Sequence, residues 1–182
     1  TKSAHLSSAV IKVILTRGLG GRGYTPPEEA ECTFIVQVFE APVYPGAYYD
    51  QGIPLHLCQH ALSYQPALAG IKHLNRLDQV LASRELHDEP EGLMLDHLGS
   101  VIEGTKSNVL IFEGQKVVTP LLEGSGVQGT LRRYLVDKQS DIGIDLVESE
   151  ITLERLKAAT GIAMINSVFG LWPVAEFSGK HY

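Results

Sequence analysis

Residues 92–138 of this chain read GLMLDHLGSVIEGTKSNVLIFEGQKVVTPLLEGSGVQGTLRRYLVDK, and they decide its fold. The first part of this stretch is rich in β-branched and other apolar residues, which is typical of strands. The pattern predicts three short strands, over residues 92–96, 100–112 and 116–119. Gly99 and Gly114 lie between them, and tight glycine turns join strands that run antiparallel. The stretch therefore predicts a β-meander.

The second part is a glycine-rich loop, residues 124–129, followed by an amphipathic segment over 130–138 that predicts a helix. The first amides of a helix have no partner within it, so a helix start can bind a phosphate group. An acidic residue roughly 20 positions further on, here Glu148, would instead suit the ribose of a nicotinamide dinucleotide. That site needs parallel strands joined by crossover helices, whereas tight turns make antiparallel pairs. We therefore expect a single phosphate here, with a nicotinamide-dependent oxidoreductase and a glycine turn without a ligand as alternatives.

Further strands and helices flank this stretch. Alternating or β-branched residues predict strands over 9–16, 32–39, 53–60, 145–150 and 162–166. Four apolar residues at helical spacing predict a helix that buries them as one stripe. They are Leu74, Leu77, Val80 and Leu81. Thr152 is a suitable N-cap for another short helix, and together these elements predict a mixed α/β (α+β) protein.

The composition argues against several kinds of partner. The formal net charge is -6 and the sequence pI is about 5.6, so no basic surface for nucleic acid or for an anionic membrane is expected. No apolar run approaches the roughly 20 residues of a membrane span, and residues 1–8 lack the apolar core of a signal peptide. We therefore expect a cytoplasmic protein. Cys32 and Cys58 are too few for a disulfide framework.

A first glycine cluster, residues 18–23 with the sequence GLGGRG, matches the pattern G-x-G-x-x-G of dinucleotide-binding sites. Such a site needs a helix at this point, but residues 24–27, YTPP, follow instead. We therefore expect a flexible hairpin loop. Arg17, Arg22 and Tyr24 could still reach a substrate carboxylate from this loop, because a guanidinium group presents paired donors to an anion.

Three possible zinc ligands, His56, Cys58 and His60, would share one face if residues 53–60 form a strand. A structural zinc site takes four ligands, and the sequence offers no evident fourth. We therefore expect these side chains to pack rather than to bind a metal.

Lys72 and Glu103 are the two candidates for chemistry. Lys72 lies in a mostly apolar segment before the predicted helix, where burial would favour an uncharged amine that can attack an aldehyde. Glu103 lies among apolar strand residues, so its carboxylate is expected to point inward and to need a cationic partner. The alternatives are a lysine whose charged end reaches solvent and a glutamate paired with a basic residue at a sheet edge.

The order of several short motifs resembles the fold-type IV family of pyridoxal phosphate (PLP) enzymes, the class IV aminotransferases. These motifs are residues 70–77 (GIKHLNRL), Glu103, Asn108, Thr119 and residues 129–132 (GTLR). Leu110 stands where the family has an aromatic residue, and Thr130 stands where it has an aliphatic one. The resemblance runs through nearly the whole chain.

The resemblance implies a role for each motif. Lys72 would hold PLP covalently and act as the catalytic base, and Glu103 would keep the pyridine nitrogen protonated. Arg17, Arg22 and Tyr24 would bind the substrate, and no metal is implied. The remaining cofactor-binding residues would be Asn108, Gly129, Thr130, Leu131, Asn166 and Ser167.

Within the family, residues 17–24 (RGLGGRGY) and 72–77 (KHLNRL) are more similar to the aminodeoxychorismate lyases than to the transaminases. This similarity implies conversion of 4-amino-4-deoxychorismate to 4-aminobenzoate and pyruvate, a step of folate biosynthesis. A branched-chain or D-amino acid transaminase of the same fold is the first alternative. Another alternative is a binding or scaffold domain without catalysis. In such a domain, replacing Lys72 with alanine would alter no activity and no spectrum.

Members of the family resemble one another in having two α/β domains and in forming homodimers. Residues 1–41 would be the remnant of a small N-terminal domain, and residues 42–47, which contain prolines and a glycine, would be a linker. Residues 48–182 would form most of a large C-terminal domain, with a mixed, barrel-like sheet flanked by helices. The resemblance also implies that the given sequence lacks an N-terminal part and a C-terminal helix of the family, and this stays an expectation.

Overall fold

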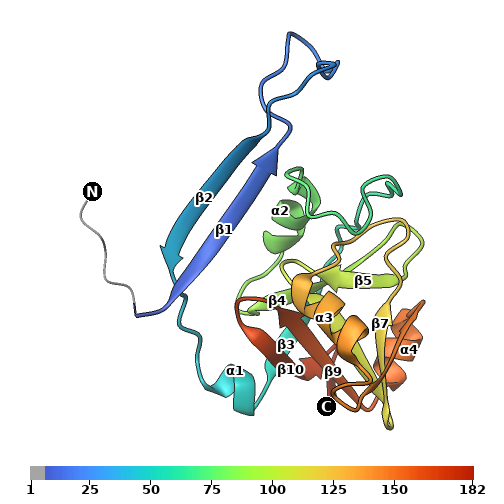
Figure 1. The fold of residues 1–182 in the computed structure, drawn as a ribbon. Helices are drawn as coiled ribbons and strands as arrows, with labels where there is room; N and C mark the ends of the chain where they lie inside the picture. The colour runs from blue at the N-terminus through green and yellow to red at the C-terminus, as the bar shows by residue number, and fades with distance from the viewer. Residues whose placement is uncertain (1–6) are drawn as a thin grey trace. The chain divides into compact units, whose positions relative to one another are not determined.

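The computed structural model describes residues 7–182. The chain divides after Val43 into two compact units, which are described separately (Figure 1). The division falls within residues 42–47, but the second half of this expected linker belongs to the second unit. There the ring of Tyr44 packs edge-on against Trp172, with centroids 4.8 Å apart, and helix α1 begins at Ala47. That the first unit is the remnant of a small domain stays a prediction.

The first unit is a β-hairpin. Strand β1, Ala9–Thr16, pairs antiparallel with β2, Thr33–Glu40, in an unbroken register. The strand predicted over 9–16 is confirmed, and the second strand begins and ends one residue later than predicted. The long loop between them carries the first glycine cluster.

The second unit is built on one 9-stranded sheet. Its strands are β3 (Ile53–Leu57), β4 (Glu91–Leu95), β5 (Val101–Gly104), β6 (Asn108–Glu113), β7 (Lys116–Pro120), β8 (Asp145–Ser149), β9 (Gly161–Asn166), β10 (Gly170–Phe177) and β11 (Lys180–His181). Its helices are α1 (Ala47–Asp50), α2 (Leu77–Ser83), α3 (Thr130–Lys138) and α4 (Leu153–Ala158). None of the helices in the described part of the chain has the length and apolar character that crossing a membrane requires.

The sheet closes on itself into a ring. Strands β4, β5 and β6 form an antiparallel meander, and β3 pairs parallel with β4. Strand β10 pairs parallel with β3 and antiparallel with β9, and β9 pairs antiparallel with β6. The path β3, β4, β5, β6, β9, β10 therefore returns to β3. This confirms the predicted mixed, barrel-like sheet of an α/β protein.

Alternate residues of the strands fill the inside of this ring. Val109 and Ile111 on β6 and Trp172 on β10 belong to one buried apolar cluster. Leu110, between the first two, points to the opposite face, where Leu131 of α3 packs against its cluster. This alternation places α3 on the outer face of the sheet, and it fixes where the helix begins.

Strands β7 and β8 run parallel, and the glycine loop and α3 connect them. The helix predicted over 130–138 is confirmed at both ends. The strands before it pair antiparallel, from β4 to β7, so the repeated crossovers of a dinucleotide-binding half are not formed.

Three sequence predictions of strands and turns need correction. The single strand predicted over 100–112 is wrong, because β5 and β6 are separated by a turn at residues 105–107. The strand predicted over 53–60 ends at Leu57, where the chain turns away from the sheet. Strands β10 and β11 were not predicted at all.

The buried stripe predicted for the helix after Leu74 is also wrong. Helix α2 begins at Leu77 and buries Ala82 against Met94 of β4 and Ile102 of β5. The four residues of the stripe are instead exposed. The exposed fractions are 67% for Leu74 and Leu77, 54% for Val80 and 43% for Leu81.

Candidate active site

A cavity of about 380 Å³ in the second unit brings together most of the predicted cofactor residues. The residues at the cavity are Lys72, Glu103, Asn108, Gly129, Thr130, Asn166 and Ser167. The side chain of Leu131 instead packs against the apolar cluster beneath α3. The cavity thus forms where the β5–β6 turn, the start of α3 and the β9–β10 turn meet.

Lys72 lies on an irregular segment that leads into α2. The guanidinium group of Arg76 donates hydrogen bonds of 2.8 Å to the carbonyl oxygens of Ile71 and His73, which fixes the backbone on both sides of Lys72. The side chain of Lys72 is exposed at the cavity, which agrees with the alternative of a lysine that reaches solvent and not with that of a buried one. Its amine makes no hydrogen bond or ion pair with another residue in 7–182.

Glu103 is 3% exposed on β5, and this burial raises the pKa of its carboxyl group. Its Oε1 accepts a hydrogen bond from Gln79 Nε2 at 3.0 Å, and its Oε2 accepts one from the Val127 amide at 2.7 Å. The charges of Arg76 and Lys72 act against the rise from a distance. Among the described residues, Glu103 therefore has two neutral donors and no paired lysine or arginine, and the expected cationic partner stays a prediction. A cation bound in the cavity would stabilise the ionised carboxylate.

Asn108 joins the strand pair to the loop before α3. It lies opposite Glu103 in the β5–β6 pair. Its Oδ1 accepts a hydrogen bond from the Gly129 amide at 3.1 Å, and its Nδ2 donates to the Val127 carbonyl at 2.7 Å. A Cβ atom on Gly129 would lie 2.2 Å from Asn108 Oδ1, so a larger residue does not fit. Gly129 therefore serves the site by close packing, and its amide is already occupied.

The start of α3 offers unpaired donors. Gly129 is the N-cap, with an extended backbone and no side-chain cap. Within residues 7–182, the amides of Thr130, Leu131 and Arg132 have no hydrogen-bond acceptor. Because such amides and the helix dipole attract anions, this side of the cavity suits a phosphate group.

Arg132 holds α3 against the sheet. It is 1% exposed, and its Nε donates to Thr119 Oγ1 at 3.1 Å. Its Nη2 donates to the Pro120 carbonyl and to Glu148 Oε1, both at 2.6 Å. Thr119 and Arg132 therefore anchor the helix. Glu148, the candidate for ribose binding, is bound to Arg132 instead, which counts against the nicotinamide alternative.

Asn166 ends β9 and shapes the turn that follows it. Its Oδ1 accepts hydrogen bonds of 2.8 Å from the amides of Val168 and Phe169, and its Nδ2 donates to the Lys106 carbonyl at 3.1 Å. The Asn166 side chain is therefore occupied by the protein itself. Ser167 is exposed beside it and is one of the residues at the cavity.

Sequence reasoning missed several residues at the cavity. They are Arg76, Gln79, Gly104, Thr105, Lys106, Ser107, Val127, Gln128 and Val168. Arg76 stands in the motif 70–77, and residues 104–107 stand between Glu103 and Asn108, so position in the motifs was a usable signal. Gln79 had no such signal, because only the fold brings it to Glu103.

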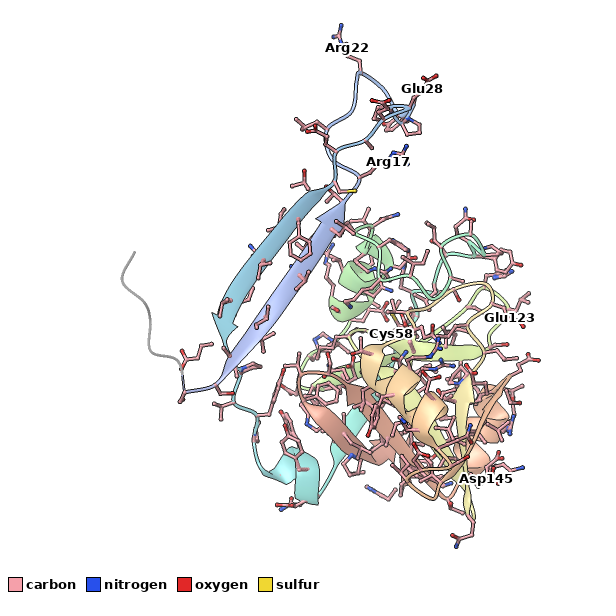
Figure 2. All side chains as sticks on the ribbon, in the orientation of Figure 1. Arg17, Arg22, Glu28, Cys58, Glu123 and Asp145 are labelled. Carbon is pink, nitrogen blue, oxygen red and sulfur yellow. The ribbon has the colours of Figure 1, made fainter. Side chains whose placement is uncertain are left out.

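The three predicted substrate residues lie in the first unit, on the loop between β1 and β2. Figure 2 shows Arg17 and Arg22 on this loop. Arg17 Nη2 donates a hydrogen bond of 2.9 Å to the Pro27 carbonyl, and the side chains of Arg22 and Tyr24 are exposed. Substrate binding by these residues stays a prediction.

The three possible zinc ligands separate. Strand β3 ends before Cys58, which is buried, so the alternation that would align the three does not continue. His56 Nε2 lies 3.8 Å from Glu85 Oε2, and His60 Nε2 lies 3.1 Å from Asp78 Oδ1. The described part of the chain holds no group of three or more potential metal ligands.

Known proteins are similar to this chain over most of its length. The sequence matches the family Amino-transferase class IV over residues 1–177. It is 36% identical over 173 residues to an aminodeoxychorismate lyase of Vibrio harveyi, which covers 94% of this chain and 64% of that protein. It is 27% identical over 179 residues to a putative branched-chain-amino-acid aminotransferase of Methanocaldococcus jannaschii, which covers 97% of this chain and 61% of that protein.

The fold is similar to that of a solved 4-amino-4-deoxychorismate lyase from Pseudomonas aeruginosa. The TM-score is 0.90 at 41% identity, over 94% of this chain and 64% of the solved one. The chain therefore spans less than two thirds of the length of these relatives. The resemblance inferred from the motifs is confirmed, and the chain belongs to the class IV aminotransferase family.

Proposed function

We propose that the full-length protein is a PLP-dependent lyase that converts 4-amino-4-deoxychorismate to 4-aminobenzoate and pyruvate. The family to which the chain belongs is PLP-dependent. The observation that carries the proposal is that Lys72, Glu103 and the start of α3 meet at one cavity. They supply an unpaired amine, a buried carboxylate and free amides. These are the groups that an aldehyde, a pyridine nitrogen and a phosphate require.

The chemistry of these groups fits PLP. The Lys72 amine would bond to the aldehyde carbon. The Glu103 carboxylate would accept a hydrogen bond from the protonated pyridine nitrogen, and this cation would offset the rise in pKa that burial causes. The amides of Thr130 and Leu131 would hold the phosphate, with Ser167 beside them. A cavity of about 380 Å³ is within the range usual for small ligands, roughly 300–1,000 Å³.

The residues of the chain would then act in sequence. When bound, PLP supplies an electron sink for the carbon that bears the substrate's amine. Lys72, displaced by this amine, would remove the proton from that carbon and would later donate a proton to the departing enolpyruvyl carbon. Aromatisation of the ring makes the release of 4-aminobenzoate and pyruvate favourable. Arg76 would keep Lys72 in place for both transfers, because it binds the carbonyl groups on either side.

The substrate side of the site is proposed from the resemblance. Arg17, Arg22 and Tyr24 would bind a substrate carboxylate, since two of them carry a cation able to form paired hydrogen bonds. A transaminase that acts on branched-chain or D-amino acids would use the same amine and carboxylate. The identity of 36% to the Vibrio lyase, against 27% to the Methanocaldococcus aminotransferase, supports the lyase.

We also propose that the full-length protein is a homodimer in the cytoplasm. The outward apolar stripe of α2 supports the homodimer, because contiguous exposed apolar residues mark interaction surfaces in proteins. Val80, which is 54% exposed, lies within this stripe. A second copy would cover the stripe and remove it from water.

The decisive experiment is borohydride reduction of the full-length protein incubated with PLP, followed by mass mapping of its peptides. Lys72 is expected to gain the reduced phosphopyridoxyl group. Lys106, another lysine at the cavity, is the internal control and should remain unmodified. An unmodified Lys72 in folded, PLP-supplied protein would exclude the proposal. Release of pyruvate and 4-aminobenzoate without an added keto acid would then separate the lyase from a transaminase.

A further inference from the structure

Glu91, at the start of β4, is 0% exposed and is not one of the cavity residues. Its carboxylate makes no ion pair within residues 7–182, yet it accepts four hydrogen bonds. Oε1 accepts from the amides of Gly92 and Thr105, at 3.0 and 2.9 Å, and from the Thr105 hydroxyl at 2.5 Å. Oε2 accepts from the Ser107 hydroxyl at 2.7 Å. A buried carboxylate is costly without such donors, and bonds to a charged acceptor are stronger than neutral ones.

All but one of these donors belong to the turn at residues 105–107, which forms part of the cavity wall. This turn joins the strand that carries Glu103 to the strand that carries Asn108. Glu103 opposite Asn108 is the one paired position between β5 and β6, so the ladder itself gives the turn little support. The hydrogen bonds from Thr105 and Ser107 to the Glu91 carboxylate supply this support instead.

The space around Glu91 is filled closely. A Cβ atom on Gly104 would lie 2.4 Å from Ser107 Oγ and 3.1 Å from the carboxyl carbon of Glu91. The Gly104 amide donates a hydrogen bond of 2.7 Å to the Ser107 carbonyl, which closes the turn. Close packing around Gly104 and the hydrogen bonds to Glu91 therefore both restrict the position of the turn.

We infer that Glu91 is a positioning residue of the active site. Its carboxylate holds the turn 105–107 and, through this turn, sets the positions of Glu103 and Asn108 that the cofactor meets. This inference rests on the proposed function for the identity of the cofactor, but the packing of the turn does not depend on it. Glu91 itself touches neither cofactor nor substrate.

The test uses full-length protein with Glu91→Met, which keeps the side-chain volume and removes both acceptors. The PLP dissociation constant, from absorbance titration of cofactor-free protein, is expected to rise about tenfold, the effect of losing a bond to a buried charged group. Glu91→Gln keeps one acceptor for Thr105, and its amide can donate to the Ser107 hydroxyl, so it should restore most of the affinity. Val118→Ala, which opens a gap elsewhere in the buried cluster, is the control for general destabilisation.

The outcomes separate positioning from stability alone. Val118→Ala should lower the melting temperature without PLP yet change the PLP dissociation constant less than about twofold, the scatter expected of distant sites. The inference is wrong if Glu91→Met binds PLP as tightly as wild type does. It is also wrong if Glu91→Met and Val118→Ala lower the melting temperature equally and weaken PLP binding equally. Thr105→Val, which removes one donor at nearly constant volume, serves if Glu91→Met does not fold, and it should weaken PLP binding about threefold.

Amide hydrogen exchange of cofactor-free protein distinguishes a failure here from a failure of the proposed function. Residues 104–108 and 127–129 should exchange faster in Glu91→Met, or in Thr105→Val, while β7 and β8 remain protected. Unchanged exchange at 104–108 would overturn the positioning role. If Lys72 of the wild type takes up no PLP, the proposed function fails, and the exchange result still decides whether Glu91 holds the turn.

Discussion

The amide of Gly129 lies 3.1 Å from Oδ1 of Asn108, and the two residues pack so closely that a Cβ atom on Gly129 would approach this oxygen to 2.2 Å. Because Asn108 also lies opposite Glu103, this contact connects the carboxylate side of the cavity with the amides at the start of α3. Asn108 therefore links the two sides of the cavity directly.

Gly129→Ala is expected to separate these two sides. The added methyl group must displace Asn108 or the start of α3, and overpacking of this kind costs about 1–3 kcal/mol. PLP titration of full-length protein should show a dissociation constant raised about tenfold. Gly46→Ala is the matched control, because a Cβ atom there meets nothing within 4 Å. Equal affinity in the two variants would show that the close contact is not needed.

Glu148→Gln tests the anchor of α3. The buried Arg132 would keep its bonds to Thr119 and Pro120 but lose its charged partner, whose side chain is 38% exposed. Since exposure screens the pair, the free energy of unfolding is expected to fall by roughly 1–2 kcal/mol. Urea unfolding measures this change. Glu176→Gln, at an exposed carboxylate, is the control and should leave the free energy of unfolding unchanged. A similar decrease in both variants would show that the Arg132–Glu148 pair does not anchor α3.

The two cysteines should differ in reactivity. Burial, followed by the charges of Glu85 and Glu91, raises the pKa of the Cys58 thiol to about 12, whereas Cys32 is exposed. The thiolate is the reactive form, so at pH 8 iodoacetamide should modify Cys32 and leave Cys58 intact until the protein unfolds. Mass spectrometry of timed samples follows both residues. Equal labelling rates in the folded protein would refute this prediction.

The stability that Asp78 contributes to the second unit should be lost in acid. Burial raises the pKa of its carboxyl group, but hydrogen bonds from Ser63 and His60 outweigh burial and hold the pKa below its usual value. A depressed pKa contributes stability above the unfolded-state value of about 4, and this contribution is lost as the pH falls through the folded-state value. The unfolding free energy of Asp78→Asn, measured in urea from pH 6 to pH 3, should therefore vary less with pH than that of wild type. Parallel curves would argue against this role.

Val80→Asp should disrupt the proposed dimer. A carboxylate within the exposed apolar stripe of α2 would lose its water if a second copy covered it, which is costly for an unpaired charge. Light scattering on full-length protein should show a larger fraction of monomer. Gln115→Asp, at an exposed neutral position in the turn between β6 and β7, is the control for one added negative charge. A variant that stays as dimeric as wild type would place the interface elsewhere.

Features that depend on neighbouring residues could be predicted from the sequence. The helix over 130–138 and its glycine loop were confirmed, because amphipathic spacing and a glycine N-cap are local signals. Thr152 caps α4 as predicted, since its side chain accepts a hydrogen bond of 3.1 Å from the Arg155 amide. The inward position of Glu103 followed from its apolar neighbours on the same strand.

Features set by distant partners could not be predicted. The strand predicted over 100–112 is interrupted at the turn 105–107, whose Thr105 and Ser107 bind Glu91, 14 and 16 residues earlier in the chain. The stripe beginning at Leu74 has the spacing of a buried face, and spacing alone cannot say which partner buries it. Gln79 meets Glu103 only because α2 packs beside the meander. Each miss concerns a contact between elements rather than the element itself.

The pairing of β3 with β10 also sets the order in which the molecule can be completed. Strand β3, residues 53–57, is synthesised long before residues 174–177 of β10. The ring closes only when these two segments pair. Until then β3 and β6 expose backbone groups that invite pairing with other chains. Because the turn with Asn166 and Ser167 lies between β9 and β10, the last two strands of the ring, the cavity is complete only after these strands have been synthesised.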